Sequence, residues 1–276
     1  MFTRRVAVVG LGVVAVASMA LTACSSSSTS STSAPKQTAT ASAPATASAA
    51  AQKSPQDLLT AAIAQLKSAG FNFTQTQGDP AAGSGIKGPG SYDPSTKSAK
   101  EVQKGSEEGI KVELDATAVN GKLWLKLDAG AINQQLKLPT GKWMLTNPAK
   151  VDAGSSPFDF SGSSDVLDIA GLMTSVSNVT LSGSTLSGTV DLTAATGDNT
   201  PDSDDVSSAG AAAKTAPFSA TLDAQGRLTA LNVDVASKAL AEAFTFADYG
   251  SPSTIGAPAA ATVVTAPAAL YSFLND

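Results

Sequence analysis

The chain of 276 residues contains no histidine and a single cysteine. Without histidine, a Ser-His-Asp triad, an HExxH zinc site and any acid–base step on an imidazole are excluded. A lone cysteine cannot form an internal disulfide or a thiolate metal site. Any catalysis would have to depend on carboxylates, lysine, tyrosine or serine, and we expect neither an enzyme nor a cofactor or metal.

Charge is also sparse, because only 15% of the residues are charged and the net charge is −5. The basic residues form no cluster or stripe, so nucleic acid is not an expected partner. An acidic chain is not attracted to anionic lipid, and attachment to a membrane would therefore have to be covalent.

The longest apolar run is short. Val6–Ala20 is too short for a membrane-spanning helix and follows the basic pair Arg4-Arg5. Leu21-Thr22-Ala23-Cys24 then matches a bacterial lipobox. The pattern predicts a signal peptide over residues 1–23, cleavage before Cys24 and covalent lipid on that cysteine. An ordinary secretory signal that contains a cysteine is the alternative, and the arginine pair leaves export by the twin-arginine route open.

Lipidation would place the chain on the extracytoplasmic face of the cell membrane. Residues 24–53 would then be the lipidated cysteine and a tether, because Ser25–Lys53 consists almost entirely of Ser, Thr, Ala and Pro. Such a segment buries too little apolar surface to fold. As a flexible chain it would reach roughly 30 Å.

Residues 54–276 are predicted to form one domain. Ser54 is a good helix N-cap before Pro55 and Asp57. An apolar helical stripe follows and Gly70 ends it: the stripe contains Leu58, Leu59, Ala62, Ile63 and Leu66.

The rest of the domain alternates apolar and polar residues, as in strands with one buried face. Asn120-Gly121 and Asp223–Gly226 predict hairpin turns. The predicted strands cover residues 71–77, 110–118, 123–127, 185–192, 218–222, 228–235 and 244–249.

Fewer segments suggest helices. We expect a second helix near Ser164–Val176 and a helical turn at Ala131–Leu136. The segment Ala194–Pro217 is predicted to be a long surface loop, and the residues after Gly250 to be extended along an edge of the sheet. The fold class is therefore α+β, with antiparallel strands whose apolar face is covered by helices.

Two short motifs overlap in a glycine-rich stretch. Gly83–Gly88 matches GxGxxG, but Pro89-Gly90 prevents the helix that a nucleotide-binding loop requires. Ser84 and Lys87 match the SxxK string of penicillin-recognising enzymes, although glycines disfavour the necessary helix and no partner motif follows. A mobile hairpin loop is the preferred interpretation of residues 78–90.

Acidic and aromatic residues give weaker signals. Asp202, Asp204 and Asp205 lack calcium-loop spacing, and Glu107-Glu108 resembles ordinary surface charge. Trp124 and Trp143 are expected to pack beneath loops or helices. The alternative for both is an aromatic rim at a ligand cavity or at a membrane-facing mouth. An interaction module would instead expose an apolar or aromatic patch around Trp124.

The order of these elements resembles actinobacterial lipoproteins of the LppX/LprAFG type, which have a LolA-like fold. The resemblance covers roughly residues 54 to 265. It rests on the lipobox and tether, on the helix near Pro55, and on Gly121–Lys126, Leu222–Leu228 and Phe244–Pro252.

The resemblance implies a strongly curved antiparallel sheet, a half-barrel, whose concave face is covered by helices. It also implies a cavity for lipid acyl chains, carriage of lipid to the cell envelope and no catalytic motif. The segments 78–90 and 194–217 would be insertions.

We therefore expect a membrane-anchored protein that binds lipid or another apolar ligand, with a membrane transporter or envelope protein as a partner. The predicted pocket residues are Val112, Leu114, Leu125, Leu167, Leu172, Met173 and Phe246. The alternative function is a non-enzymatic cell-surface interaction or scaffolding module with a closed core. A carboxylate-based hydrolase is a third hypothesis, for which no residue spacing nominates a pair.

Overall fold

A computed structural model describes residues 53–107, 110–152, 158, 166–196, 203–235 and 240–275. The predicted signal peptide, Cys24 and the tether as far as residue 52 lie outside these ranges. No helix within the described ranges combines the length and the apolar content needed to cross a bilayer.

The first helix, α1 (Pro55–Gln65), begins where its sequence predicts. The Ser54 hydroxyl accepts a hydrogen bond from the Asp57 backbone N–H at 3.1 Å, and the Ser54 N–H donates to the Asp57 carboxylate at 3.3 Å. This reciprocal capping box satisfies two N–H groups that the helix itself leaves unpaired. The other described helices are α2 (Ala131–Gln135), α3 (Ile169–Leu172), α4 (Ser203–Ala209), α5 (Ala211–Lys214) and α6 (Ala268–Asn275).

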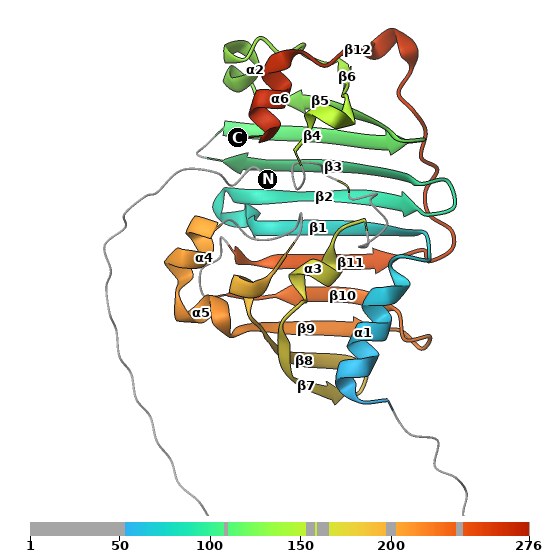
Figure 1. Ribbon diagram of the computed structural model, residues 1–276, viewed down its shortest axis with the longest axis vertical. Coiled ribbons are helices and arrows are strands. Elements are labelled where there is room, and N and C mark those ends of the chain that lie inside the picture. The colour runs from blue at the N-terminus through green and yellow to red at the C-terminus, as the bar shows by residue number, and fades with distance from the viewer. Residues whose placement is uncertain are drawn as a thin grey trace, which may run out of the picture. The chain divides into compact units, whose positions relative to one another are not determined.

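Within the described residues, twelve strands form one sheet (Figure 1). They are β1 (Phe71–Asp79), β2 (Ser84–Asp93), β3 (Ser98–Glu107), β4 (Ile110–Val119), β5 (Lys122–Asp128), β6 (Trp143–Leu145), β7 (Val176–Ser182), β8 (Thr185–Val190), β9 (Ala216–Leu222), β10 (Leu228–Val233), β11 (Glu242–Ala247) and β12 (Val263–Thr265). Their order is β12-β6-β5-β4-β3-β2-β1-β11-β10-β9-β8-β7, so the sheet is unclosed, with β12 and β7 at its edges. Only the β12–β6 pair among these is parallel. The predicted α+β class with a curved antiparallel sheet is confirmed.

One face of the sheet carries the core and is called the inner face below. Register places its residues in rows across the strands: Phe73 pairs with Phe246 and with Gly90, and Ala116 pairs with Leu125. Helices and connecting segments cover this face (Figure 1). They contribute Leu59 of α1, Leu172 of α3, Ala213 of α5 and Leu270 of α6 to the same buried cluster.

Several sequence predictions are confirmed by this arrangement. The predicted strands correspond to β1, β4, β5, β8, β9, β10 and β11. Asn120 and Gly121 join β4 to β5 with φ values of 52° and 73°. Both angles are positive, as a two-residue type I′ hairpin turn requires. The helical turn near Ala131 is α2, and β12 lies at the predicted sheet edge.

The prediction of a mobile loop over residues 78–90 is wrong for most of its length, because Ser84–Asp93 is the central strand β2. The reason for the glycines is steric. A Cβ atom added at Gly90 would lie 2.1 Å from Cζ of Phe73, whose ring covers the position. Glycine in a strand interior often marks such a close approach.

The predicted helix over Ser164–Val176 is also wrong in extent. Only α3 is helical among its described residues, and Val176 already begins β7. The Thr174 hydroxyl donates to the Gly171 carbonyl at 2.8 Å, which satisfies a carbonyl at the helix end. Val176 is β-branched and therefore favours the extended conformation in which β7 begins.

The predicted loop over Ala194–Pro217 contains two short helices and the start of β9. Asp204 and Asp205 lie in the first turn of α4, where negative charge is favourable. Gly210, with φ of 55°, separates α4 from α5. Beyond Gly250, the sequence interpretation missed α6.

Candidate functional site

The seven predicted pocket residues come together in one buried cluster on the inner face. Val112 and Leu114 lie on β4, Leu125 on β5 and Phe246 on β11, while the others lie on α3 or beside it: Leu167, Leu172 and Met173. Each is at most 8% exposed. Their burial suits both a ligand-lined face and a filled core, so their role as ligand contacts stays a prediction.

The two tryptophans lie on or near the opposite face. Trp124 is only 7% exposed, which agrees with packing rather than with an exposed aromatic patch. Trp143 is half-buried, and Nζ of Lys126 lies 5.3 Å from the centroid of its ring. Lys126 also forms an ion pair with Asp115, so the two strands β4 and β5 present an organised polar row on this outer face.

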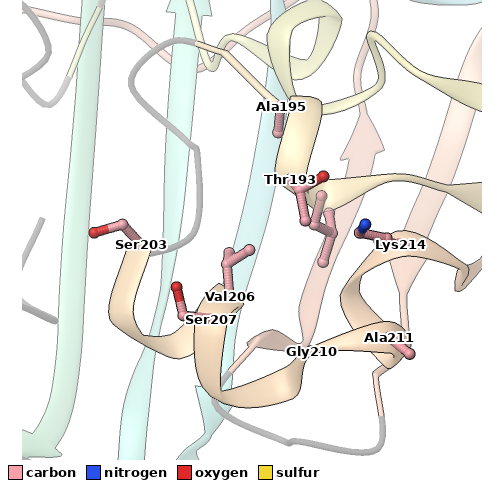
Figure 2. A pocket seen from close by; sticks show the side chains of 9 residues that line it. Thr193, Ala195, Ser203, Val206, Ser207, Gly210, Ala211 and Lys214 are labelled. Carbon is pink, nitrogen blue, oxygen red and sulfur yellow. The ribbon is translucent and has the colours of Figure 1, made fainter.

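An open hollow of about 760 Å³ lies in the helical cover, between the 3₁₀ turn η3 (Leu192–Ala194) and helices α4 and α5 (Figure 2). In Figure 2, Val206 points from α4 toward η3 across the hollow, and Ser203 and Ser207 lie along the same helix. The complete lining is Leu192, Thr193, Ala195, Ser203, Val206, Ser207, Gly210, Ala211 and Lys214. Leu192 is 3% exposed and belongs to the core as well, so the hollow reaches the buried cluster.

None of the seven predicted residues lines this hollow. Except for Leu192 and Thr193, its walls come from Ala194–Pro217, the segment that the sequence interpretation treated as a surface loop. A mixed apolar and hydroxyl lining of this size is typical of small-molecule sites, whose volumes are commonly about 300–1,000 Å³. The Lys214 ammonium group is the positive charge among the lining residues.

A line of polar side chains crosses the otherwise apolar inner face and is called the polar belt below. Its members share the face of Phe73 and Phe244 by strand parity and register, and they are Gln75, Gln77, Glu101, Gln103 and Glu242. Gln75, Glu101 and Glu242 are each at most 4% exposed. Buried carboxyl groups without water are costly, so their environment determines their charge state.

Glu242 lies at the start of β11, opposite Gln77 of β1. The Gln77 amide nitrogen donates to Oε1 of Glu242 at 2.7 Å, whereas Oε2 has no hydrogen-bond partner within the described structure. Burial raises the pKa of Glu242 to about 8, against the opposing effect of hydrogen bonds from Gln77 and Gln75. This carboxyl group is therefore mostly neutral at pH 7.

Glu101 of β3 behaves similarly. The Gln103 amide donates to its Oε1 at 2.8 Å. Burial raises the pKa of Glu101 to about 7, with that hydrogen bond acting in the opposite direction. On β1–β5 and β8–β11, the described inner-face positions carry no lysine or arginine that would neutralise either carboxylate.

The weaker motifs gain no support from their positions. The GxGxxG match leads into β2 rather than into a helix, and Ser84 and Lys87 lie on that strand rather than one turn apart on a helix. Asp204 and Asp205 are on α4, and the described residues contain no group of three or more potential metal ligands. Asp202 and Glu108 lie outside the described residues.

Sequence reasoning missed the polar belt. Gln75 has the strand parity of Phe71 and Phe73, and this signal was available in the sequence. Glu101 and Gln103 lie on β3, a strand that was not predicted. Glu242 precedes the first residue of the predicted strand at Phe244, so its face was not assigned.

Comparison with known proteins gives little. No protein-family model matches the chain, and no curated protein matches it. Among solved structures, the crystal structure of the lipoprotein LppX of Mycobacterium tuberculosis is similar with a TM-score of 0.41 and 14% sequence identity. The match covers 73% of this chain and 98% of that one. A likeness of this size establishes neither membership of a family nor a shared function.

Proposed function

We propose that this protein is a non-enzymatic lipoprotein that binds lipid or another apolar ligand between the inner face of the sheet and its helical cover. The observation that carries the proposal is the combination of a large apolar sheet face with an interrupted cover. Short helices and connecting segments, rather than long packed helices, lie over that face (Figure 1).

The hollow beside α4 and α5 supports this proposal. It opens in the cover, it has the volume of a ligand site, and it meets the buried cluster at Leu192. An apolar chain entering there would lose contact with water along the buried face. Burial of apolar surface favours binding by roughly 25 cal/mol per Å² and tolerates chains of varied structure.

The anchor completes the proposed role. Lipid on Cys24 would hold the domain at the extracytoplasmic face of the cell membrane, and the tether would let it reach away from the bilayer. In this proposal the protein belongs with the LppX/LprAFG-type lipoproteins and carries lipid to the cell envelope, and it receives or delivers the lipid through a membrane transporter or envelope protein.

Native mass spectrometry of the full chain, extracted from the membrane of a bacterium that processes lipoproteins, tests the proposal. We expect one population with the mass of the acylated chain and a second with an additional noncovalent lipid. A Cys24→Ser chain controls for the anchor, because it should lose the covalent acyl mass and keep the capacity for noncovalent lipid. The absence of any noncovalent lipid from both chains would favour the scaffolding alternative with a closed core.

A further inference from the structure

The polar belt contains a buried carboxyl oxygen, Oε2 of Glu242, that accepts no hydrogen bond from the described residues. Glu242 is 3% exposed, its Oε1 accepts a hydrogen bond from Gln77, and its Oε2 has no hydrogen-bond partner within the described structure. Leaving a buried polar atom without a hydrogen bond is unfavourable, because it has lost its contact with water. Such an atom in a native structure calls for an explanation.

We propose that Glu242, supported by Gln75 and Gln77, forms a polar subsite that binds one oxygen-bearing group of an otherwise apolar ligand. The inference rests on the proposed function and specifies its ligand as an amphiphile. The polar group would lie at the start of β11, and the apolar chain would lie against the phenylalanines of the same face. Because Oε2 is out of contact with solvent, a ligand can reach it only if the side chains around it move apart.

The geometry also indicates which chemistry the subsite prefers. Because Oε1 already accepts from Gln77, a proton on a neutral carboxyl group resides on Oε2. Oε2 then donates to an acceptor oxygen, which a hydroxyl, ester or ether group can supply. Burial favours this neutral form, so an anionic or cationic headgroup is not required.

Alternative explanations predict different ligands. An anion-binding site would need a cation on this face, and the described inner-face positions of β1–β5 and β8–β11 have none. A metal site would need at least three potential ligands together, and the described residues show no such group. A neutral oxygen on an apolar chain matches both the unpaired atom and its surroundings.

The test compares three probes with the same 12-carbon chain: dodecane, 1-dodecanol and methyl dodecanoate. Each displaces the apolar dye N-phenyl-1-naphthylamine from the full chain carrying Cys24→Ser, which avoids detergent. The variants are Glu242→Leu, Glu242→Gln and the control Glu113→Gln, whose carboxylate forms an exposed ion pair with Lys104 on the outer face. Urea unfolding verifies that each variant is folded.

The decisive quantity is the ratio of the affinity for 1-dodecanol to the affinity for dodecane. The hydration free energy of each probe is the same for every variant, so a change in this ratio between variants reports only the contacts that the protein makes. Glu242→Leu should lower this ratio about fivefold, the value of one buried hydrogen bond, with dodecane binding unchanged or tighter. Glu242→Gln should keep the ratio within about twofold of wild type, since its amide still offers a donor. Methyl dodecanoate should follow 1-dodecanol, and Glu113→Gln should change nothing.

Two results would overturn the subsite, and they are distinguishable. If all probes bind and Glu242→Leu leaves the ratio unchanged, Glu242 has only a structural role and the proposed function stands. If neither the dye nor any probe binds to the wild-type chain, the subsite and the proposed function both fail.

Discussion

The buried carboxyl groups on the two faces of the sheet have different hydrogen-bonding and charged neighbours. On the outer face, Asp115 of β4 forms an ion pair with Lys126 of β5, and the Lys126 ammonium lies over the Trp143 ring. On the inner face, Glu242 has amide neighbours, the described inner-face positions of β1–β5 and β8–β11 carry no lysine or arginine, and burial raises its pKa to about 8. The outer carboxyl group is paired with a cation, whereas burial of the inner carboxyl groups favours their neutral form.

This difference indicates what each face can do. Replacing both partners of a buried ion pair by well-packed apolar residues is often neutral or stabilising, so a buried ion pair is weak evidence for stability. The outer pair holds two strands together. Glu242 gives an apolar face a hydrogen-bonding position that is mostly neutral at pH 7, which suits an amphiphilic ligand. The predictions below test this contrast.

The largest expected effect is on the pH dependence of stability. Since the pKa of Glu242 is higher in the folded chain, the folded state binds more protons than the unfolded state from about pH 5 to pH 8. The free energy of unfolding should therefore fall as pH rises through this window, by up to about 4 kcal/mol from Glu242. Glu101 adds a smaller loss in the same direction, ending near pH 7.

Urea unfolding at several pH values measures this slope. Glu242→Gln should be much less sensitive to pH over the same window. Three other carboxyl groups with shifted pKa values titrate below this window: Asp93, Asp191 and Asp223. Burial raises the pKa of each, but hydrogen bonds lower it and the net shift is downward. An unchanged slope in Glu242→Gln would contradict the neutral inner face.

The next largest effect should come from the outer face. Lys126→Met leaves Asp115, whose side chain is 9% exposed, without its cation. Because Lys126 is itself partly exposed, we expect a loss of about 2–3 kcal/mol rather than the full cost of a deeply buried pair. The double variant Asp115→Asn with Lys126→Met should recover most of that loss. A single-variant effect below about 0.5 kcal/mol in urea unfolding would show that the pair does not stabilise the fold.

A smaller effect is expected at the centre of the inner face. Gly90→Ala forces a methyl group against the Phe73 ring and should destabilise the chain by about 2 kcal/mol. The double variant with Phe73→Leu should cost less than the sum of the single changes. Gly256→Ala is the matched control, since no atom lies within 4 Å of its added Cβ, and its unfolding midpoint should not move. Equal unfolding midpoints for Gly90→Ala and Gly256→Ala would show that the Phe73 ring does not lie against Gly90.

The smallest effect should follow loss of the aromatic ring beside Lys126. Trp143→Leu removes the cation–π contact at 5.3 Å and should cost about 0.5–1 kcal/mol. In a chain that already carries Lys126→Met the cation–π contact is absent, so Trp143→Leu should not lose this contribution a second time. A double-variant cycle on urea midpoints measures the coupling, and a coupling of zero would show that the ring only fills space.

Local chemistry in the sequence was enough for some of the fold. The Ser54 capping box and the Asn120-Gly121 turn depend on residues close together in the chain, and both are found. β2 could not be predicted, because its glycines are explained by close approach to other strands, such as that of Gly90 to the Phe73 ring. The short α3 was overestimated because its apolar stripe continues into Val176, which pairs with Val190 of β8 instead.

The candidate site was predicted less well. The apolar residues of the inner face follow from alternation, and the seven predicted residues are buried together. The polar belt depends on the register between β1 and β11, since only pairing places Glu242 opposite Gln77. Sequence alone treats a glutamate near a strand end as surface charge, and burial by distant segments reverses that expectation.

A crystal structure of the full chain purified from membranes, with its copurified lipid, tests the central claim most directly. The account predicts continuous density for an apolar chain between the inner face and its cover, with an oxygen atom within hydrogen-bond distance of Glu242 Oε2. An inner face filled completely by the protein's own side chains, with no ligand density there, would contradict it.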